Sequence, residues 1–137
     1  MTSTDKPSLM YFNSIGSAHL GFITVTEPGL NMPFEIKRVY WTYYTPQNVQ
    51  RGGHAHFDLH QLIFAVSGKI TFYTETLAGQ KDTFVLEEPN VGLYIPNLVW
   101  RDITFSHSAV LLCLASDIYK SSDYIRSYEQ FQSLRSS

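Results

Sequence analysis

Short stretches of alternating hydrophobic and polar residues, separated by turn residues, dominate this chain. Residues 34–45 alternate and are rich in aromatic side chains, and residues 59–80 have the pattern of two strands joined at Ser67-Gly68. Alternation with a period of two is typical of half-buried β-strands, and Gly or Pro at the breaks indicates turns. Further strands are predicted in residues 21–28, 81–106 and 108–116. The last segment is continuously apolar, so we expect burial on both of its faces.

Only residues 121–137 have helical character. Tyr124, Tyr128 and Phe131 follow one another at spacings of four and three, and Ser121 or Ser122 is expected to cap the helix. Short strands with one terminal helix predict an all-β fold, a small antiparallel barrel or jelly roll. The length predicts one domain over residues 1–137. A barrel of this size can hold a single ligand in its mouth.

The composition narrows the classes of partner. Apolar residues make up 44% of the chain, charged residues only 16%, and the formal net charge is −2. No run of Lys and Arg offers a footprint for phosphates, so we expect no nucleic-acid partner. The N-terminus lacks the basic and apolar flanks of a signal peptide, and no segment has the length of a membrane span. We therefore expect a cytoplasmic protein without a membrane partner, with Cys113 buried as an inert thiol.

The segment RGGHAHFDLHQLIFAVSG, residues 51–68, concentrates three of the five histidines within seven positions. His54 and His56 alternate, so on a strand their side chains point to the same side. From Gly53 onward, the spacing of His-x-His, Gln61 and Gly68 resembles the first cupin motif. In that motif a Glu normally stands at the position of Gln61 and binds a metal ion together with the two histidines.

The segment GLYIPNLVWRDI matches the second cupin motif only in part. Pro96 is in place, but Leu98 stands where that motif has Gly and Arg101 stands where it has the third histidine. Gln is an uncharged and poorer ligand, and a guanidinium repels a divalent cation. We therefore expect a cupin fold without a metal ion. His60 is an alternative third ligand only if no bulge separates it from the other histidines.

A narrower resemblance covers residues 33–131. The segments PFEIKRVYWTYYT, RGGHAHFDLHQ, VGLYIPNLVWRDI, LASDIY and DYIRSYEQF follow one another in the chain. Together they resemble the sugar-nucleotide 3,4-ketoisomerases, the WxcM-like metal-free cupins. The resemblance implies an enzyme without a metal or other cofactor. This enzyme moves the ketone of dTDP-4-keto-6-deoxyglucose from C4 to C3 in deoxyamino-sugar biosynthesis, for example for the O-antigen of lipopolysaccharide.

The implied reaction requires groups that carry protons. A base removes the proton at C3, an enediolate forms, and protonation at C4 gives the 3-keto sugar. Imidazoles titrate near neutral pH, so His54 and His56 are the predicted carriers, one as base and its neighbour as acid or orienter. By resemblance Tyr40 is the third catalytic residue, donating to a developing oxyanion or relaying a proton. Packing is the alternative role for Tyr40, since one bulge exchanges the aromatic side chains that face inward.

Five residues are predicted to bind the substrate. Arg38, which shares a strand face with Tyr40, and Arg51 are candidates for the diphosphate, because planar guanidinium groups bind phosphate well. Arg101 is expected to stabilise the enediolate or to contact phosphate. Gln61 is expected to bind a sugar hydroxyl or to fix a histidine tautomer. Trp100 packs either on the substrate or in the core.

The resemblance also carries expectations about the tail and the assembly. Asp117, Tyr119, Asp123 and Tyr124 in the tail are read as structural, with Ser122 or Asp123 opening the helix. Members of the family form homodimers, often with exchanged N-terminal strands, and the low charged fraction agrees with a large subunit interface. Some relatives are fused to an acetyltransferase domain, so the single cupin domain is either complete or a piece of a bifunctional chain.

Two other functions stay open at this point. A sugar-nucleotide epimerase with the same type of barrel also uses His and Tyr beside a ketone, but it inverts carbon centres. A non-catalytic, metal-free cupin can instead serve as a sugar-binding module in which the histidines only donate hydrogen bonds. A fold supports many functions, so the site must decide between them.

Overall fold

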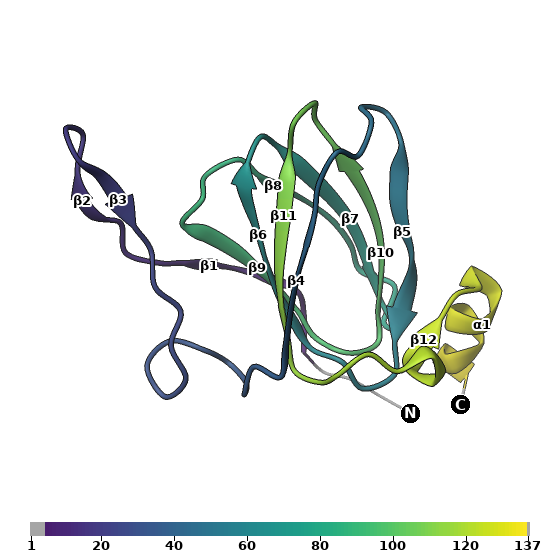
Figure 1. Ribbon diagram of the computed structural model, residues 1–137. Coiled ribbons are helices and arrows are strands. Elements are labelled where there is room, and N and C mark those ends of the chain that lie inside the picture. Colours follow the sequence, from purple (N-terminus) through teal and green to yellow (C-terminus); the bar gives the residue numbers. More distant parts are fainter. Residues whose placement is uncertain (1–4, 137) are drawn as a thin grey trace.

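The computed structural model describes residues 5–136, and it confirms the predicted all-β jelly roll with a short C-terminal helix. Two five-stranded antiparallel sheets pack face to face, and a small hairpin stands apart from them (Figure 1). The first sheet has the order β1 (Ser8–Tyr11), β9 (Val91–Ile95), β6 (Gln61–Ser67), β11 (Val110–Ala115) and β4 (Arg38–Thr42). The second has the order β12 (Tyr124–Ile125), β5 (Gln50–His56), β10 (Val99–Phe105), β7 (Ile70–Thr76) and β8 (Lys81–Leu86). The hairpin consists of β2 (Ile15–Ser17) and β3 (Gly21–Ile23).

The main core lies between the two sheets. Strand alternation places Ile63 and Ala65 of β6 against Phe72 of β7 and Ile103 of β10 in one buried cluster. The intervening residues of the first sheet point outward, where Leu62 and Phe64 form a second cluster. The apolar strand predicted in residues 108–116 is β11, and Cys113 on its inner face is fully buried.

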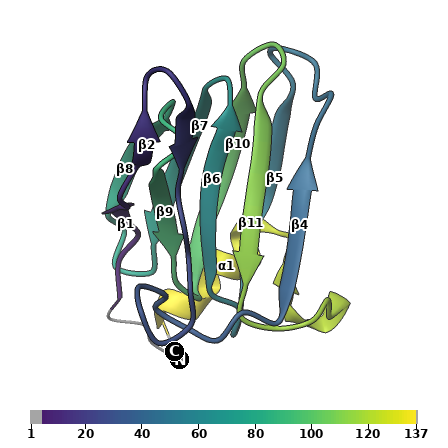
Figure 2. The ribbon, with the colours of Figure 1, turned by 60° about the vertical axis from the view of Figure 1, so that its left-hand side comes forward.

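The two sheets meet along one edge of the sandwich and stand apart along the other. Strands β8 and β9 contact each other and close one side. On the opposite side β4 is the outer strand of the first sheet, and β5 with the short β12 borders the second (Figure 2). The side chains that face inward from β4 and β5 therefore border a gap between the sheets.

A bulge interrupts β5 just before the histidines. His54 pairs with Arg101 of β10, but the next residue of β10 pairs with Gly52, so Gly53 has no partner in the register. Both glycines have left-handed backbones, with φ of 83° at Gly52 and 67° at Gly53. A side chain at Gly52 would lie 2.9 Å from the Arg101 carbonyl oxygen. Glycine is therefore required for this close approach, which sets the direction of the histidine side chains.

The tail is less helical than its spacing predicts. A 3₁₀ turn, η1 (Ser121–Asp123), leads into β12, and the only α-helix among residues 5–136 is α1 (Tyr128–Ser133), followed by the 3₁₀ turn η2 (Leu134–Ser136). The predicted cap at Ser121, Ser122 or Asp123 is wrong, because Ser127 accepts a hydrogen bond from the Gln130 amide instead. Pairing of Tyr124 and Ile125 with β5 makes that segment a strand.

Helix α1 docks on the outer face of the second sheet. Phe131 is fully buried against Trp100 and Ile125. The Tyr128 hydroxyl donates to the Glu75 carboxylate, and Arg135 also donates to that carboxylate. Within residues 5–136 no helix is both long and apolar enough to cross a membrane.

Candidate active site

A cavity of about 540 Å³ opens between β4 and β5. Its polar lining comes from both sheets and from the segment around β12: Arg38, Tyr40 and Thr42 on β4, Arg51 and His54 on β5, and Tyr119, Tyr124 and Arg126. Alternation on β4 turns Arg38 and Tyr40 to the same side, as predicted, and Thr42 lies on that side as well. The cavity therefore combines an imidazole, phenols and guanidinium groups in one space.

The two histidines lie side by side at the wall of this cavity. Their ring centroids are 4.9 Å apart, and the rings are nearly perpendicular. His54 lines the cavity, whereas His56 is only 1% exposed and packs against Tyr124, 4.4 Å between centroids. The pair is thus layered, with His54 in contact with the ligand space and His56 behind it.

His56 is held by a carboxylate from the tail. Its Nδ1 lies 3.1 Å from Oδ2 of Asp123. The Asp123 carboxylate also accepts hydrogen bonds from the backbone amides of Asp58 and Leu59, at 2.8 and 3.3 Å. An acceptor fixed in this way assigns the proton to Nδ1 and leaves Nε2 of His56 as the free nitrogen.

A second chain of hydrogen bonds lies deeper in the barrel. Arg101 is 1% exposed, and it donates to Oε1 of Gln61 and to the Val99 carbonyl. Gln61 is 2% exposed, and its Nε2 lies 3.0 Å from the Tyr40 hydroxyl and 3.4 Å from the sulfur of Cys113. Tyr40 reaches the cavity, so this chain connects a buried cation to a phenol at the ligand space.

Burial and positive charge determine the protonation states. Burial, followed by the charge of Arg101, lowers the pKa of His54 to about 3 and that of His56 to about 2. Both imidazoles are therefore neutral at neutral pH, and each can accept a proton. Burial raises the pKa of Tyr40 well above its ordinary value, so this side chain is a phenol that donates. Burial lowers the pKa of Arg101 to about 10, which leaves the guanidinium charged.

Guanidinium groups and tyrosine rings surround the opening of the cavity. The guanidinium of Arg38 lies between Tyr40 and Tyr119, at 5.5 and 5.7 Å from their ring centroids. Arg126 lies 4.1 Å from the centroid of Tyr124. Together with Arg51, these groups form a cationic and aromatic rim suited to an anion that carries a ring.

Three of the predicted substrate-binding residues do not line the cavity. Gln61 and Arg101 lie behind its wall, because they occupy the interior face and bond to each other. Trp100 points to the opposite face of β10, where its indole packs on Tyr128 and Phe131. The structure thus gives Trp100 the core-packing role, one of its two predicted roles, and it places Gln61 and Arg101 in the interior without direct contact with the cavity.

The structure provides no cluster of metal ligands in the described part of the chain. Among residues 5–136, no group of three or more His, Cys, Asp or Glu side chains is arranged to hold a metal ion. His60 does not join the other histidines, because its Nδ1 lies 2.6 Å from the Tyr94 hydroxyl. The Arg101 charge beside His54 and His56 would also oppose a divalent cation.

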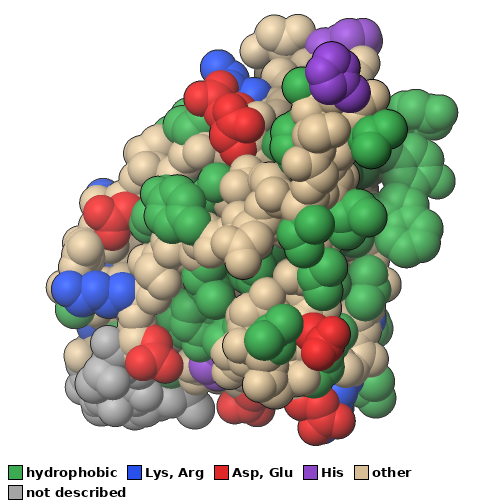
Figure 3. Space-filling view, turned by 90° about the vertical axis from the view of Figure 1, so that its left-hand side faces the viewer, with side chains coloured by type: hydrophobic (Ala, Val, Ile, Leu, Met, Phe, Trp, Pro, Cys, Tyr) green, Lys and Arg blue, Asp and Glu red, His purple; other side chains and the backbone are tan. Residues whose placement is uncertain are grey.

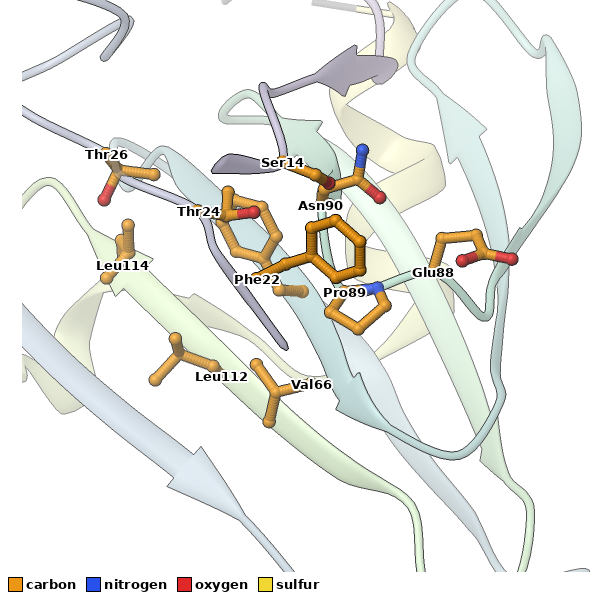
Figure 4. Close-up of a pocket in the computed structure, with 11 residues that line it drawn as sticks. Ser14, Phe22, Thr24, Thr26, Val66, Glu88, Pro89, Asn90, Leu112 and Leu114 are labelled. Carbon is orange, nitrogen blue, oxygen red and sulfur yellow. The ribbon is translucent and has the colours of Figure 1, made fainter. Parts of the chain in front are cut away.

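A slightly larger cavity, about 610 Å³, lies outside the first sheet beneath the N-terminal hairpin (Figure 4). Its walls include Phe22 and Thr24 of the hairpin arm and Val66, Leu112 and Leu114 of the sheet. Glu88 is the only one of its lining residues with a titratable side chain. This cavity therefore lacks the groups for acid–base chemistry, and we assign the active site to the smaller one.

The contribution of the tail was not predicted from the sequence. Tyr119, Asp123 and Tyr124 were expected to be structural and Arg126 was not a candidate, yet Tyr119, Tyr124 and Arg126 line the cavity and Asp123 holds His56. A signal was present, because LASDIY and DYIRSYEQF in the tail are among the segments that carry the resemblance. Only the pairing of β12 with β5 brings the tail close to the histidines.

Comparisons with known proteins agree with this geometry. The family described as FdtA, WxcM-like, C-terminal matches residues 5–136. The TDP-4-oxo-6-deoxy-α-D-glucose-3,4-oxoisomerase of Aneurinibacillus thermoaerophilus is 36% identical over 113 residues, which is 82% of this chain and 81% of that protein.

Solved structures of 3,4-ketoisomerases are also similar to this chain. A histidine-to-asparagine variant of the 3,4-ketoisomerase QdtA from Thermoanaerobacterium thermosaccharolyticum, in complex with TDP-4-keto-6-deoxyglucose, has a TM-score of 0.88 at 34% identity. The similarity covers 94% of this chain and 93% of that one. A 3,4-ketoisomerase from Helicobacter canadensis has a TM-score of 0.89 at 32% identity over 96% and 98% of the two chains.

Proposed function

Since this chain belongs to the FdtA, WxcM-like, C-terminal family, we propose that it is a TDP-sugar 3,4-ketoisomerase that moves the ketone of TDP-4-keto-6-deoxyglucose from C4 to C3. The proposal rests on one observation: a neutral imidazole, His54, and a phenol, Tyr40, line the same cavity. These are the two kinds of group that proton transfer beside a ketone requires.

Each proton in this reaction has a proposed carrier. His54 removes the proton at C3, and the electron pair forms the enediolate with the oxygen at C4. Tyr40 donates a hydrogen bond to that developing oxyanion, while the Arg101 charge behind the wall stabilises it electrostatically. Protonated His54 then delivers a proton to C4, and one proton moves from the oxygen at C3 to the oxygen at C4. The bonds made and broken balance, and the product is the 3-keto sugar.

His56 supports His54 rather than touching the substrate. It is buried behind its neighbour and fixed by Asp123, so it orients the imidazole that reaches the cavity. Bound anions favour the protonated form of a nearby imidazole, so the diphosphate and the enediolate raise the pKa of His54 during turnover. The low pKa of His54 before the substrate binds keeps this imidazole unprotonated in the free protein.

The rim of the cavity provides the binding energy for the nucleotide. We propose that Arg38, Arg51 and Arg126, which line the cavity, bind the diphosphate, since guanidinium groups pair well with phosphate oxygens. The rings of Tyr119 and Tyr124 offer faces for the thymine or the sugar. Arg38 and Arg51 thereby keep the role expected from the sequence.

A homodimer completes the proposal. The outer face of the first sheet exposes Val39, Trp41 and Val66, with Trp41 61% exposed, and Tyr43 extends this strip. The hairpin adds the exposed residue Phe22, and hydrophobic side chains gather over this side of the molecule (Figure 3). A soluble protein rarely leaves such a surface uncovered. We propose that a second copy covers it, with the N-terminal arms exchanged between two single-domain subunits.

The test is turnover of TDP-4-keto-6-deoxyglucose in deuterated water, followed by proton NMR. We expect the C3 proton signal to disappear, deuterium to enter C4, and a 3-keto product to form. Exchange at C3 or C5 with the ketone left at C4 would instead identify an epimerase. Tight binding of the nucleotide sugar without any exchange would identify a binding module.

A matched pair of histidine variants assigns the base. His54→Asn should abolish exchange at C3 while TDP still binds, because the amide cannot accept the proton. His107→Asn, on the surface, should leave turnover unchanged. Full activity of the His54 variant would remove His54 from the mechanism.

A further inference from the structure

Gln61 lies in the interior of the barrel with every polar atom of its amide used. Its oxygen accepts from Arg101, and its nitrogen faces Tyr40 at 3.0 Å and Cys113 at 3.4 Å. The orientation of this amide follows from chemistry, because a guanidinium only donates and therefore requires the oxygen of Gln61. Both donors of the amide are thus engaged, and the side chain is only 2% exposed, so Gln61 does not contact a substrate in the cavity.

This orientation determines what Tyr40 can do with its proton. An amide N–H only donates, so the Tyr40 oxygen must accept from Gln61. The phenolic proton then points away from Gln61. Its interior alternative is the thiol of Cys113, which lies opposite Tyr40 in the strand register and is a weak acceptor. An oxyanion in the cavity is a far stronger acceptor, so it takes this proton.

We propose that Gln61 is a positioning residue for Tyr40: Arg101 orients its amide, and the amide directs the phenolic proton of Tyr40 to the substrate. This inference rests on the proposed ketoisomerase reaction, in which Tyr40 donates to the developing oxyanion. It also explains why an amide stands at a position where the cupin motif has a carboxylate. A carboxylate would accept the phenolic proton and turn it away from the cavity.

The decisive variant is Gln61→Glu, which keeps the size of the side chain and the pairing with Arg101 but exchanges the donor for an acceptor. We expect kcat to fall by about 10²-fold, as when an oxyanion donor is removed, with KM nearly unchanged. Gln132→Glu, an exposed position on α1, adds the same charge and should leave kcat unchanged. An unchanged kcat in the Gln61 variant would overturn the inference.

A double-mutant cycle separates positioning from a general structural effect. If Gln61 acts through Tyr40, Gln61→Glu should change kcat by less than about twofold in a Tyr40→Phe background. Additive losses in the double variant would show that Gln61 acts independently of Tyr40, against the proposal.

A readout without turnover keeps the two proposals distinguishable. In protein labelled with ¹³Cζ-tyrosine, the Tyr40 resonance is the one lost in Tyr40→Phe, and it should move when Gln61→Glu reverses the hydrogen bond. An inactive wild type would overturn the proposed function, while this resonance still tests the hydrogen bond. An unmoved resonance would overturn the positioning role whether or not the wild type is active.

Discussion

Nδ1 of His56 lies 3.1 Å from Oδ2 of Asp123, although 67 residues separate them in the chain. The pairing of β12 with β5 brings the tail carboxylate to the histidine strand. The Asp58 and Leu59 amides also donate to this carboxylate and hold it in place. This contact makes the tail part of the proposed active site.

Replacing Asp123 with Asn should lower kcat by about 10²-fold or more, with little change in KM. The Asp58 N–H, whose 2.8 Å bond is shorter than the 3.3 Å bond of the Leu59 N–H, keeps the Asn oxygen at the Oδ1 position. The amide nitrogen then takes the Oδ2 position, where it loses the Leu59 bond and donates to His56, which moves the imidazole proton from Nδ1 to Nε2. The measurement is the turnover assay in deuterated water, with thermal melting to verify the fold. Asp58→Asn removes a neighbouring charge from an exposed side chain and should keep full kcat. Equal rates for all three proteins would exclude the tautomer argument.

Acid should destabilise the fold through the histidine pair. In the folded protein the pKa of His54 is about 3 and that of His56 is about 2, both below the ordinary value of 6.5. At any pH between these values and 6.5, the unfolded chain therefore binds more protons than the folded chain. The free energy of unfolding must then fall as pH falls below about 6.5, by about 1.4 kcal/mol per pH unit for each neutral imidazole. Urea unfolding at several pH values between 7 and 4.5 measures this slope. His54→Asn should reduce the slope and His107→Asn should not; identical slopes would contradict the assignment.

The bulge at Gly52 should tolerate no side chain. In Gly52→Ala the new Cβ lies 2.9 Å from a backbone oxygen at a φ of 83°, which is expected to cost about 1–3 kcal/mol and to displace His54. Stability by urea unfolding and kcat should both fall. Gly79→Ala is the matched control, because φ is 91° there but no atom lies within 4 Å. It should lose stability only, and equal kcat losses in the two variants would refute the role of the bulge.

The proposed dimer should depend on Trp41. Light scattering after size-exclusion chromatography is expected to give a dimer mass for the wild type and a monomer mass for Trp41→Glu, because a charge cannot be buried in an apolar interface without a partner. Tyr73→Glu makes the same change at a similarly exposed aromatic residue of the second sheet, and it should stay dimeric. A monomeric wild type would overturn the assembly.

The sequence by itself determined the strands and much of the chemistry. Alternation is a local property, so the shared strand face of Arg38 and Tyr40 and the two strands joined at Ser67-Gly68 could be predicted, although β6 and β7 belong to different sheets. The His-x-His spacing and the replacement of two usual metal ligands by Gln61 and Arg101 could also be read from the sequence.

Tertiary structure decided which of these residues meet. Trp100 and Arg101 are neighbours in sequence, yet they face opposite sides of β10, toward α1 and toward the histidines. Asp123 belongs to a segment with helical spacing, but pairing of the adjacent Tyr124 and Ile125 with β5 overrides that local preference. The position of His56 behind His54 and the burial of Gln61 depend on long-range strand pairing, which local periodicity does not encode. The sequence thus determined the groups available for the reaction, and the packing of the two sheets decided which of them reach the substrate.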